Sequence, residues 1–296
     1  MSEHIRQREL TDADGTRQKL SYPDLPEPLL VGTYDNHTHL EIADGDQPMN
    51  YKDHLALANQ VGILGAVQVG VTLESSKWCS EVAASDPRLL AAVAIHPNEA
   101  ARYETQAALD EDIDGIAGLA SQERVRAIGE TGLDFFRTES EQGKSFQKHS
   151  FERHIQIAKD FNLALQIHDR DAHEQVVETL LRVGAPDRVV FHCYSGDIEL
   201  AKKCAEHGWY TSFAGNITIK RNQHLRDSLK HMPKELILVE TDAPFLTPEP
   251  LRGRPNAPYL VPITVRFMAL ELGMDANELS GQLARNTVAV YGSWGS

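Results

Sequence analysis

The chain has 296 residues, with 29 lysine and arginine residues against 43 aspartate and glutamate residues, which gives a formal net charge of −14. Hydrophobic residues make up 41% and charged residues 24%, proportions that exclude a wholly disordered chain. The sequence contains neither an apolar run of transmembrane length nor a secretory signal, and its three cysteines form no CxxC pair, so we expect a cytoplasmic protein without disulfides. The acidic balance disfavours unspecific binding to nucleic acid, although bound cations would change the local field.

Residues 1–30 are polar and end in a proline-rich stretch, so we expect an N-terminal extension that is loose or wraps the surface, before a single domain over 31–296. In that domain, short apolar runs alternate with helical stretches. The runs predict eight strands, at 31–37, 64–70, 89–97, 125–130, 163–169, 188–194, 209–215 and 235–242. The stretches predict helices at 52–61, 73–84, 141–160, 171–183, 196–207, 221–231, 258–273 and 275–291.

This alternation is typical of parallel strands joined by crossover helices. Eight such units in about 260 residues predict an α/β fold of the (β/α)8 TIM-barrel type. The alternative is a doubly wound open sheet. It would need a glycine-rich loop after the first strand, where this chain reads DNHTHL.

Side chains that can bind metal follow five of the predicted strands. In a TIM barrel the carboxyl ends of all strands meet on one face, so these side chains should converge there. His37 and His39 are two residues apart on an extended chain and should point to the same side. The spacing of His168 and His192 is about one βα unit, which places them on neighbouring strands. The predicted metal ligands are His37, His39, Glu130, His168, His192 and Asp242.

Four imidazoles and two carboxylates suit a pair of divalent cations, with Mg²⁺, Mn²⁺ and Zn²⁺ as the candidates. We predict one ion held by His37, His39 and Asp242, a second ion held by the histidines of the fifth and sixth strands, and Glu130 between the two ions. A two-metal site of this kind activates water and neutralises both oxygens of a phosphoryl displacement.

Other polar residues at the strand ends are candidates for supporting roles. Asp35 and Asp134 either orient a ligating imidazole or are loop residues. His96, at the end of the third strand, either contacts substrate and donates a proton or packs in the core. Basic side chains after the strands are candidates for holding phosphate, with solvated surface loops as the alternative. They are Arg170, Arg252 and Arg254, followed by Arg137, Lys220 and Arg221.

The motifs DNHTHL, IHP, IGETGLD, QIHDRDAHE, FHCYSG, SFAGNITIK, VETDAPFL and RGRPNAPYL occur in this order, and the chain resembles the TatD-type metal-dependent deoxyribonucleases of the amidohydrolase superfamily. The resemblance covers residues 31–291. It implies the same six metal ligands, with Asp242 also acting as the general base toward the attacking water and Glu130 as its catalytic partner. It further implies magnesium-dependent hydrolysis of DNA phosphodiesters, commonly as a 3′–5′ exonuclease on single strands or ends.

The chain departs from the family pattern at Asn36, where threonine is common, and in its long N-terminal extension. D-aminoacyl-tRNA deacylation is an alternative activity on the same site. Another alternative is a superfamily hydrolase for amides, lactones or phosphotriesters, although many of these use a carboxylated lysine where this chain has Glu130. A barrel that binds metal without turnover would lack a ligand or the base, and neither is missing. We expect a monomer, because a closed barrel leaves no sheet edge to pair.

Overall fold

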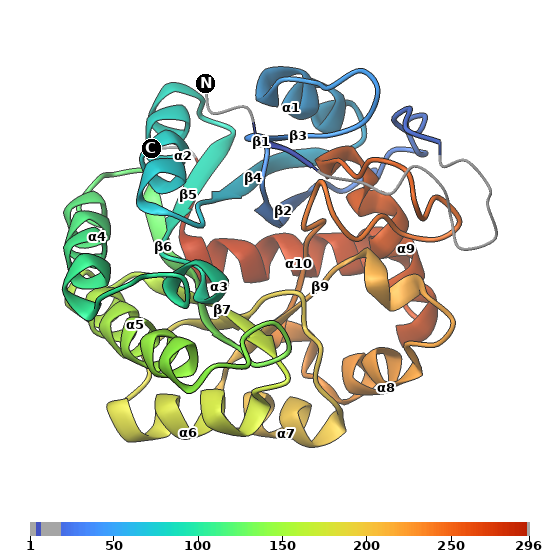
Figure 1. Cartoon of the computed structure of the whole chain (residues 1–296). Coiled ribbons are helices and arrows are strands. Elements are labelled where there is room, and N and C mark those ends of the chain that lie inside the picture. Colours follow the sequence, from blue (N-terminus) through green and yellow to red (C-terminus); the bar gives the residue numbers. More distant parts are fainter. Residues whose placement is uncertain (1–3, 7–18, 295–296) are drawn as a thin grey trace.

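Eight parallel strands form a barrel in the order in which they follow one another along the chain (Figure 1). A computed structural model describes residues 4–6 and 19–294. The strands are β2 (Thr33–Thr38), β4 (Ile63–Val69), β5 (Leu89–Val93), β6 (Val125–Asp134), β7 (Ala164–Arg170), β8 (Val189–Phe191), β9 (Tyr210–Phe213) and β10 (Ile237–Val239). Each overlaps one of the eight predicted runs, although β6 continues four residues beyond the predicted end at Glu130 and β8 and β10 are shorter than predicted. The predicted TIM barrel is confirmed.

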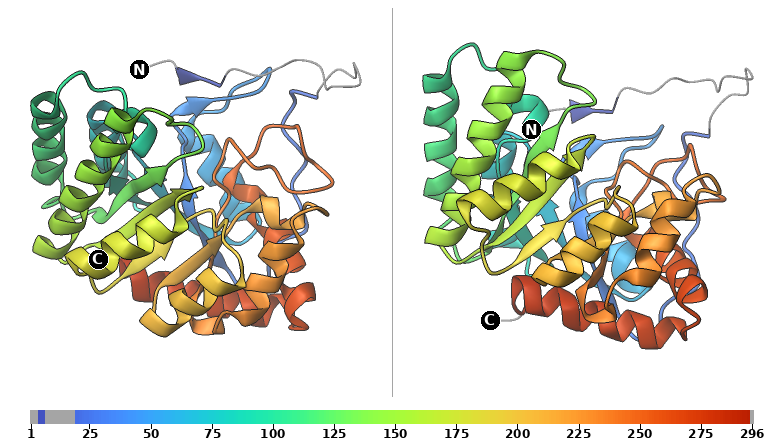
Figure 2. Two further views of the ribbon diagram at one scale, coloured as in Figure 1. Left: turned by 60° about the horizontal axis from the view of Figure 1, so that its bottom comes forward. Right: turned by 90° about the horizontal axis from the view of Figure 1, so that it is seen from below.

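The helices lie outside the strands, as two further views show (Figure 2). They are α1 (Tyr51–Gln60), α2 (Leu73–Ser85), α3 (Pro97–Ala100), α4 (Gln106–Leu119), α5 (Glu141–Asp160), α6 (His173–Val183), α7 (Ile198–His207), α8 (Gln223–His231), α9 (Val261–Leu272) and α10 (Ala276–Tyr291). Three 3₁₀ turns add η1 (Gly215–Thr218), η2 (Lys234–Leu236) and η3 (Pro258–Leu260). Within the described residues, none of the helices combines the length and the hydropathy of a transmembrane span.

Helix α4 was not predicted from the sequence. Its first turn is capped by the Thr105 hydroxyl, which accepts a hydrogen bond from the Ala108 amide, and its buried face carries Leu109, Ile113 and Ile116. Two glycines and four acidic residues in the same stretch weaken the helical pattern. The packing of the apolar face against α2 and α5 outweighs that low propensity.

The strands read as continuously apolar because both of their faces are buried. Along β5, Leu89 and Ala91 pack with the surrounding helices, whereas Leu90 and Ala92 fill the barrel interior. This alternation fixes which residues near a strand end point into the barrel mouth.

The seam between the first and last strands is closed mainly by side chains. One backbone bridge joins Thr38 to Ala243. The Asn36 amide donates to the Val239 carbonyl at 2.8 Å, and the Asp35 carboxylate accepts from the Thr241 amide at 2.8 Å. Asn36, the departure from the family pattern, therefore bonds across the seam to residues distant in the sequence.

The described part of the N-terminal extension lies along the surface of the barrel. Strand β1 (His4–Ile5) pairs in parallel with β3 (Ile42–Ala43) in a small separate sheet, which the sequence did not predict. Residues 19–30 are anchored by the buried Leu29 and by a hydrogen bond from Arg266 to the Pro28 carbonyl at 3.0 Å. The rest of the predicted extension, residues 1–3 and 7–18, lies outside the described part, and the division at residue 30 stays a prediction.

Candidate metal centre

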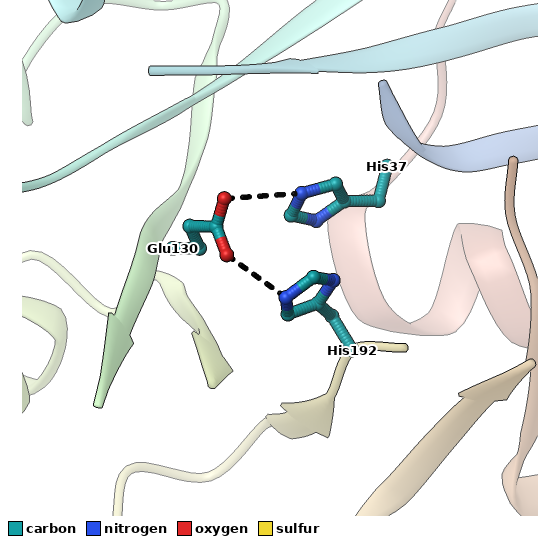
Figure 3. A group of neighbouring side chains, drawn as sticks. All are labelled: His37, Glu130 and His192. Atoms are coloured by element: carbon teal, nitrogen blue, oxygen red, sulfur yellow. Dashed lines mark ion pairs between the residues drawn. The ribbon is translucent and has the colours of Figure 1, made fainter. Parts of the chain in front are cut away.

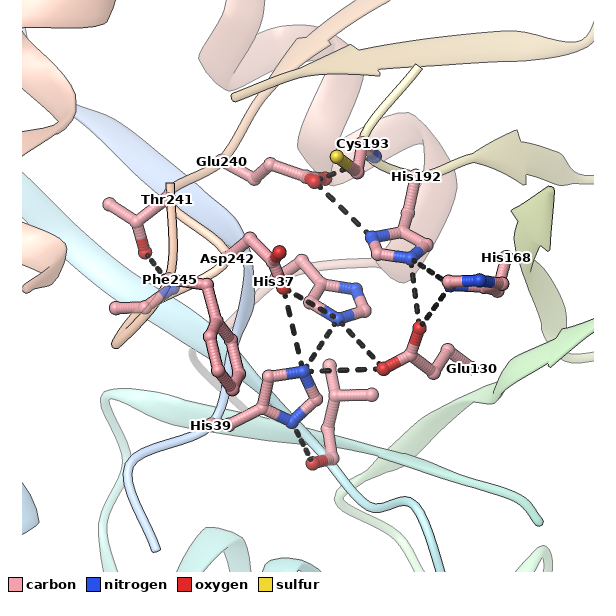
Figure 4. Close-up of polar contacts among 12 residues, drawn as sticks. His37, His39, Glu130, His168, His192, Cys193, Glu240, Thr241, Asp242 and Phe245 are labelled. Atoms are coloured by element: carbon pink, nitrogen blue, oxygen red, sulfur yellow. Dashed lines mark hydrogen bonds and ion pairs between the residues drawn. The ribbon is translucent and has the colours of Figure 1, made fainter. Parts of the chain in front are cut away.

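The six predicted metal ligands converge at the carboxyl ends of the strands (Figure 4). His37 and His39, from β2 and the residue after it, bring their Nε2 atoms within 3.1 Å of each other. His168 on β7 and His192 after β8 place Nδ1 and Nε2 3.5 Å apart. Both distances agree with the predictions made from the spacing of these histidines.

Glu130 lies between the two pairs of histidines, and each of its carboxylate oxygens faces one pair (Figure 3). Oε1 is 3.3 Å from His39 Nε2 and 3.6 Å from His37 Nε2. Oε2 is 2.9 Å from His192 Nε2 and 3.1 Å from His168 Nδ1. One buried carboxylate thus joins two sets of possible ligand atoms.

Asp242 completes the set on the Oε1 side. Its Oδ1 atom lies 3.6 Å from His39 Nε2 and 3.7 Å from His37 Nε2. The backbone holds it there, because the Asp242 amide donates to the His37 carbonyl at 2.9 Å and the His39 amide donates to the Ala243 carbonyl at 2.7 Å. Asp242 has φ +55°, a left-handed conformation that turns the chain into the mouth.

Every histidine of the set has a hydrogen-bond partner on the nitrogen that faces away from Glu130. The partners are Gln166 Oε1 for His37, the Val69 carbonyl for His39, Asp134 Oδ2 for His168 and Glu240 Oε1 for His192, at 3.0, 3.0, 3.2 and 3.3 Å. All four partners are acceptors, so the outer nitrogen of each neutral ring carries the proton. The inner nitrogen then offers its lone pair to the pocket.

Two of these partners, Gln166 and Glu240, were not predicted from the sequence. Gln166 precedes His168 by two residues and Glu240 precedes Asp242 by two, so each shares a strand face with a ligand. A polar residue inside an otherwise apolar run is the signal that identifies them.

Asp35 and Asp134, for which the sequence left two alternative roles, have different hydrogen-bond partners. Asp134 orients His168, in agreement with one of the two alternatives. Among the described residues, Asp35 makes no hydrogen bond to an imidazole nitrogen. Its carboxylate accepts from the Thr241 and His37 amides and so fixes the backbone on both sides of the seam.

The charges of the pocket favour a cation. Burial opposes ionisation of Glu130 and Asp242, but the surrounding imidazoles outweigh it and lower the pKa of both carboxyls. Burial also lowers the pKa of His37, which favours its neutral form. The carboxylates Glu130 and Glu240 overcome burial at His192 and raise its pKa to about 10, so without a metal ion this ring holds a second proton, which a bound cation would replace. Imidazole lone pairs and ionised carboxylates in this arrangement fit divalent metal ions.

His96 lies at the edge of the same pocket, on the Oε2 side of Glu130. Its Nδ1 accepts from the Asn98 amide at 3.0 Å and caps α3, and its Nε2 is 3.5 Å from Glu130 Oε2. Burial lowers the pKa of His96 to about 3, so the ring is neutral with its proton on Nε2. His96 lies close to Glu130 and His168, but in this state its Nε2 is a hydrogen-bond donor toward Glu130 and not a ligand atom.

The basic side chains predicted to hold phosphate have different settings. The Arg170 guanidinium lies 4.0 Å from the centre of the Phe136 ring, which is 58% exposed on the loop after β6. Arg254 instead donates to the carbonyls of Ser21 and Tyr22, at 3.1 and 2.7 Å. The others are exposed on loops that follow strands: Arg137, Lys220, Arg221 and Arg252.

Comparisons with known proteins identify the family of this chain. The family described as TatD related DNase matches residues 34–292. The chain is 36% identical over 261 residues to the uncharacterized metal-dependent hydrolase TatD of Mycobacterium tuberculosis. This alignment covers 87% of the present chain and 97% of that protein. It is 33% identical over 247 residues to the 3′–5′ ssDNA/RNA exonuclease TatD of Escherichia coli, with coverage of 81% and 92%.

The fold is shared with solved structures. The TatD homologue YJJV of Escherichia coli superposes with a TM-score of 0.78 at 24% identity, over 88% of this chain and 98% of that one. With the profile matching most of the sequence and two relatives above 30% identity, the protein belongs to the TatD family of metal-dependent hydrolases.

Proposed function

We propose that the protein is a 3′–5′ exonuclease that hydrolyses phosphodiesters of single-stranded DNA. The observation that carries this proposal is the position of Glu130, whose Oε1 faces His37 and His39 and whose Oε2 faces His168 and His192. Two-metal sites of this type serve in-line displacement at phosphorus. The family description as a DNase and the name of the Escherichia coli relative support the same reaction.

The residues have distinct roles in this reaction. His37, His39 and Asp242 would hold one Mg²⁺, Mn²⁺ or Zn²⁺ ion, because their ligand atoms form one compact group. His168 and His192 would hold a second ion, with Glu130, which contacts both pairs of histidines, common to the two. When bound, the ions acidify water and neutralise charge on the phosphate oxygens. Asp242 is ionised, and its side chain is 15% exposed against 5% for Glu130, so Asp242 is the carboxylate placed to accept a proton from the attacking water.

Single-stranded substrate is favoured by the exposed Phe136 ring beside Arg170. Bases stack on exposed aromatic rings only when they are unpaired, and an adjacent guanidinium adds a contact for phosphate or base. Phe136 follows β6, which carries Glu130, by two residues, and Arg170 is the last residue of β7, which carries His168. The pair therefore lies on the rim of the same mouth as the ligands.

The test is a panel of DNA substrates labelled at either end, single-stranded and duplex, assayed with each metal in turn. We expect nucleotides to be released from the 3′ end of single strands, and chelation to abolish their release. Glu130→Gln should lower turnover by more than about 100-fold, because loss of an outer partner alone costs about 10–100-fold. Glu139→Gln, an exposed change on the loop after β6, is the matched control and should keep wild-type turnover.

Two results would contradict the proposal. Wild-type turnover by Glu130→Gln would show that the bridging carboxylate is not needed. Hydrolysis of D-aminoacyl-tRNA esters, with no nucleotide released from any DNA, would place the protein with the deacylases instead.

A further inference from the structure

The segment before β2 is absent from the matches that define the family. The family match begins at residue 34. The alignment with the Mycobacterium tuberculosis relative includes 97% of that protein but only 87% of this chain. In the structure, this segment nevertheless contacts the loop that carries Asp242. We call residues 240–257, between β10 and η3, the β10 loop.

Arg254 of the β10 loop is tied to the backbone of this segment. Its Nε donates to the Ser21 carbonyl at 3.1 Å, and its Nη2 donates to the Tyr22 carbonyl at 2.7 Å. Just beyond the loop, the buried Tyr259 donates its hydroxyl proton to the Pro23 carbonyl at 2.7 Å. Three consecutive carbonyls of the N-terminal segment thus accept hydrogen bonds from the loop and the turn that follows it.

These contacts are connected to Asp242 through the loop itself. Asn256, two residues after Arg254, is buried and donates to the Thr241 carbonyl at 2.9 Å and to the Phe245 carbonyl. The Thr247 hydroxyl donates to the Arg254 carbonyl at 2.6 Å. The backbone on both sides of Asp242 is therefore fixed by residues that lie next to the bonds with the N-terminal segment.

A second contact comes from Arg6, at the end of β1. Its guanidinium pairs with Asp44 at 3.3 Å, donates to the Pro244 carbonyl and lies 4.7 Å from the centre of the Phe245 ring. Phe245 packs edge-on against the ring of His39, with centroids 6.3 Å apart. The segment thus contacts the β10 loop at two separate points.

We propose that the N-terminal segment clamps the β10 loop and so fixes Asp242 in the metal centre, with Arg254 as a positioning residue and not a phosphate ligand. The proposal rests on the proposed function to the extent that Asp242 holds a metal ion there. The Nε and Nη2 atoms of the Arg254 guanidinium already donate to two backbone carbonyls, so this edge of the side chain is not free to bind phosphate. The same two hydrogen bonds restrain the loop directly.

The experiment measures Mn²⁺ binding to the full-length protein without substrate, by calorimetry, together with kcat and KM on single-stranded DNA. Arg254→Gln should weaken Mn²⁺ binding by about tenfold and lower kcat, with KM little changed, because an outer contact of a metal site typically contributes about 10–100-fold to affinity. Arg254→Lys, which keeps one charged donor, should restore part of the affinity. Tyr259→Phe removes a single hydroxyl and should weaken Mn²⁺ binding by a smaller factor, and it serves as the test if Arg254→Gln does not fold.

Arg266→Gln is the matched control. Arg266 makes the same kind of bond to the same segment, at the Pro28 carbonyl, but it lies on α9 outside the β10 loop. It should leave Mn²⁺ affinity and kcat at wild-type values.

Three results would overturn the clamp. Arg254→Gln with wild-type Mn²⁺ affinity and a raised KM would make Arg254 a phosphate contact. Equal losses in Arg254→Gln and Arg266→Gln would indicate a general loss of stability. Wild-type Mn²⁺ affinity and kinetics in both Arg254→Gln and Tyr259→Phe would leave the segment without a role in the site. Failure of the wild-type protein to bind Mn²⁺ would contradict the proposed function itself, which is a separate outcome.

Discussion

The nitrogen that each site histidine turns toward Glu130 is selected by the acceptor on its other nitrogen. His192 shows this most clearly, because Glu240 Oε1 accepts from both the imidazole, at 3.3 Å, and the Cys193 amide, at 2.7 Å. Glu240 is fully buried, so its charge acts on the imidazole with little screening by water. This carboxylate makes the inner nitrogen a stronger ligand.

Glu240→Gln should therefore weaken metal binding by about tenfold, the lower end of the range for such partners, because glutamine keeps the acceptor and removes the charge. Calorimetric titration with Mn²⁺ measures the change. Glu235→Gln, an exposed change on η2 before the same strand, serves as the control. Unchanged affinity in Glu240→Gln would mean that the hydrogen bond alone, and not the charge, prepares His192.

How far the sequence predicts a residue's role depends on where its partner lies. Five of the six ligands were predictable because they stand at or near a strand end, and the fold brings all such ends together. Glu130 lies within β6, four residues before its end, and still faces the same pocket. The role of Arg254 was not, because its partners are backbone carbonyls 232 and 233 positions away in sequence. Every residue type offers a backbone carbonyl, so the sequence does not indicate which carbonyls an arginine will contact. An arginine that follows a strand is therefore predicted to bind phosphate.

At the scale of elements, β6 depends on glycine for its close approach to β7. Gly132 has φ +136°, and a Cβ atom added there would collide with the carbonyl oxygen of His168. The pairing in this region shifts register between Ile128 and Thr131, beside Glu130. Glycine at 132 thus allows the two strands that carry Glu130 and His168 to lie side by side.

Gly132→Ala should lower the free energy of unfolding by about 1–3 kcal/mol from backbone strain alone, and should weaken metal binding, since β6 must move away from His168. Chemical denaturation with and without Mn²⁺ measures both effects. Gly118→Ala, in α4, is the matched control: nothing lies near the added methyl group, and alanine favours the helix. A variant at 132 as stable as the one at 118 would show that β6 tolerates a side chain there.

The strands were more predictable than the shorter elements around them. A strand buried on both faces, such as β5, is apolar at every position, and this signal does not depend on neighbours. By contrast, β1 and β3 have two residues each and form only because the chain returns to pair them. Pairs this short leave no periodicity in a sequence.

At the scale of the whole molecule, two histidines outside the ligand set are buried in the folded chain. His154 on α5 accepts from the Ile95 amide at 3.3 Å, and burial lowers its pKa to about 3. His54 on α1 packs edge-on against Tyr22 of the N-terminal segment, with ring centroids 5.5 Å apart, and its Nδ1 is buried without a hydrogen-bond partner among the described residues. Burial lowers the pKa of His54 to about 4, against the opposing charge of Asp44.

These histidines make the fold sensitive to acid. Below pH 6.5 the unfolded chain takes up a proton at position 54, whereas the folded chain does so only near pH 4. The free energy of unfolding is therefore unaffected by His54 above pH 6.5, and it decreases as the pH falls from 6.5 to 4. A folded-state pKa of about 4 against 6.5 in the unfolded chain corresponds to about 3 kcal/mol for His54.

His54→Leu removes this group. As the pH falls from 7 to 4, the free energy of unfolding of the variant should rise by about 3 kcal/mol relative to that of wild type, because leucine has no proton to take up on unfolding. Denaturation curves at a series of pH values, in the presence of chelator, measure the difference, and titration of the metal ligands cancels because both proteins share them. His224→Leu, an exposed change on α8, should instead follow the wild-type profile. Parallel profiles for wild type and His54→Leu would mean that His54 takes up its proton at the same pH in the folded and the unfolded chain, with Asp44 compensating for its burial.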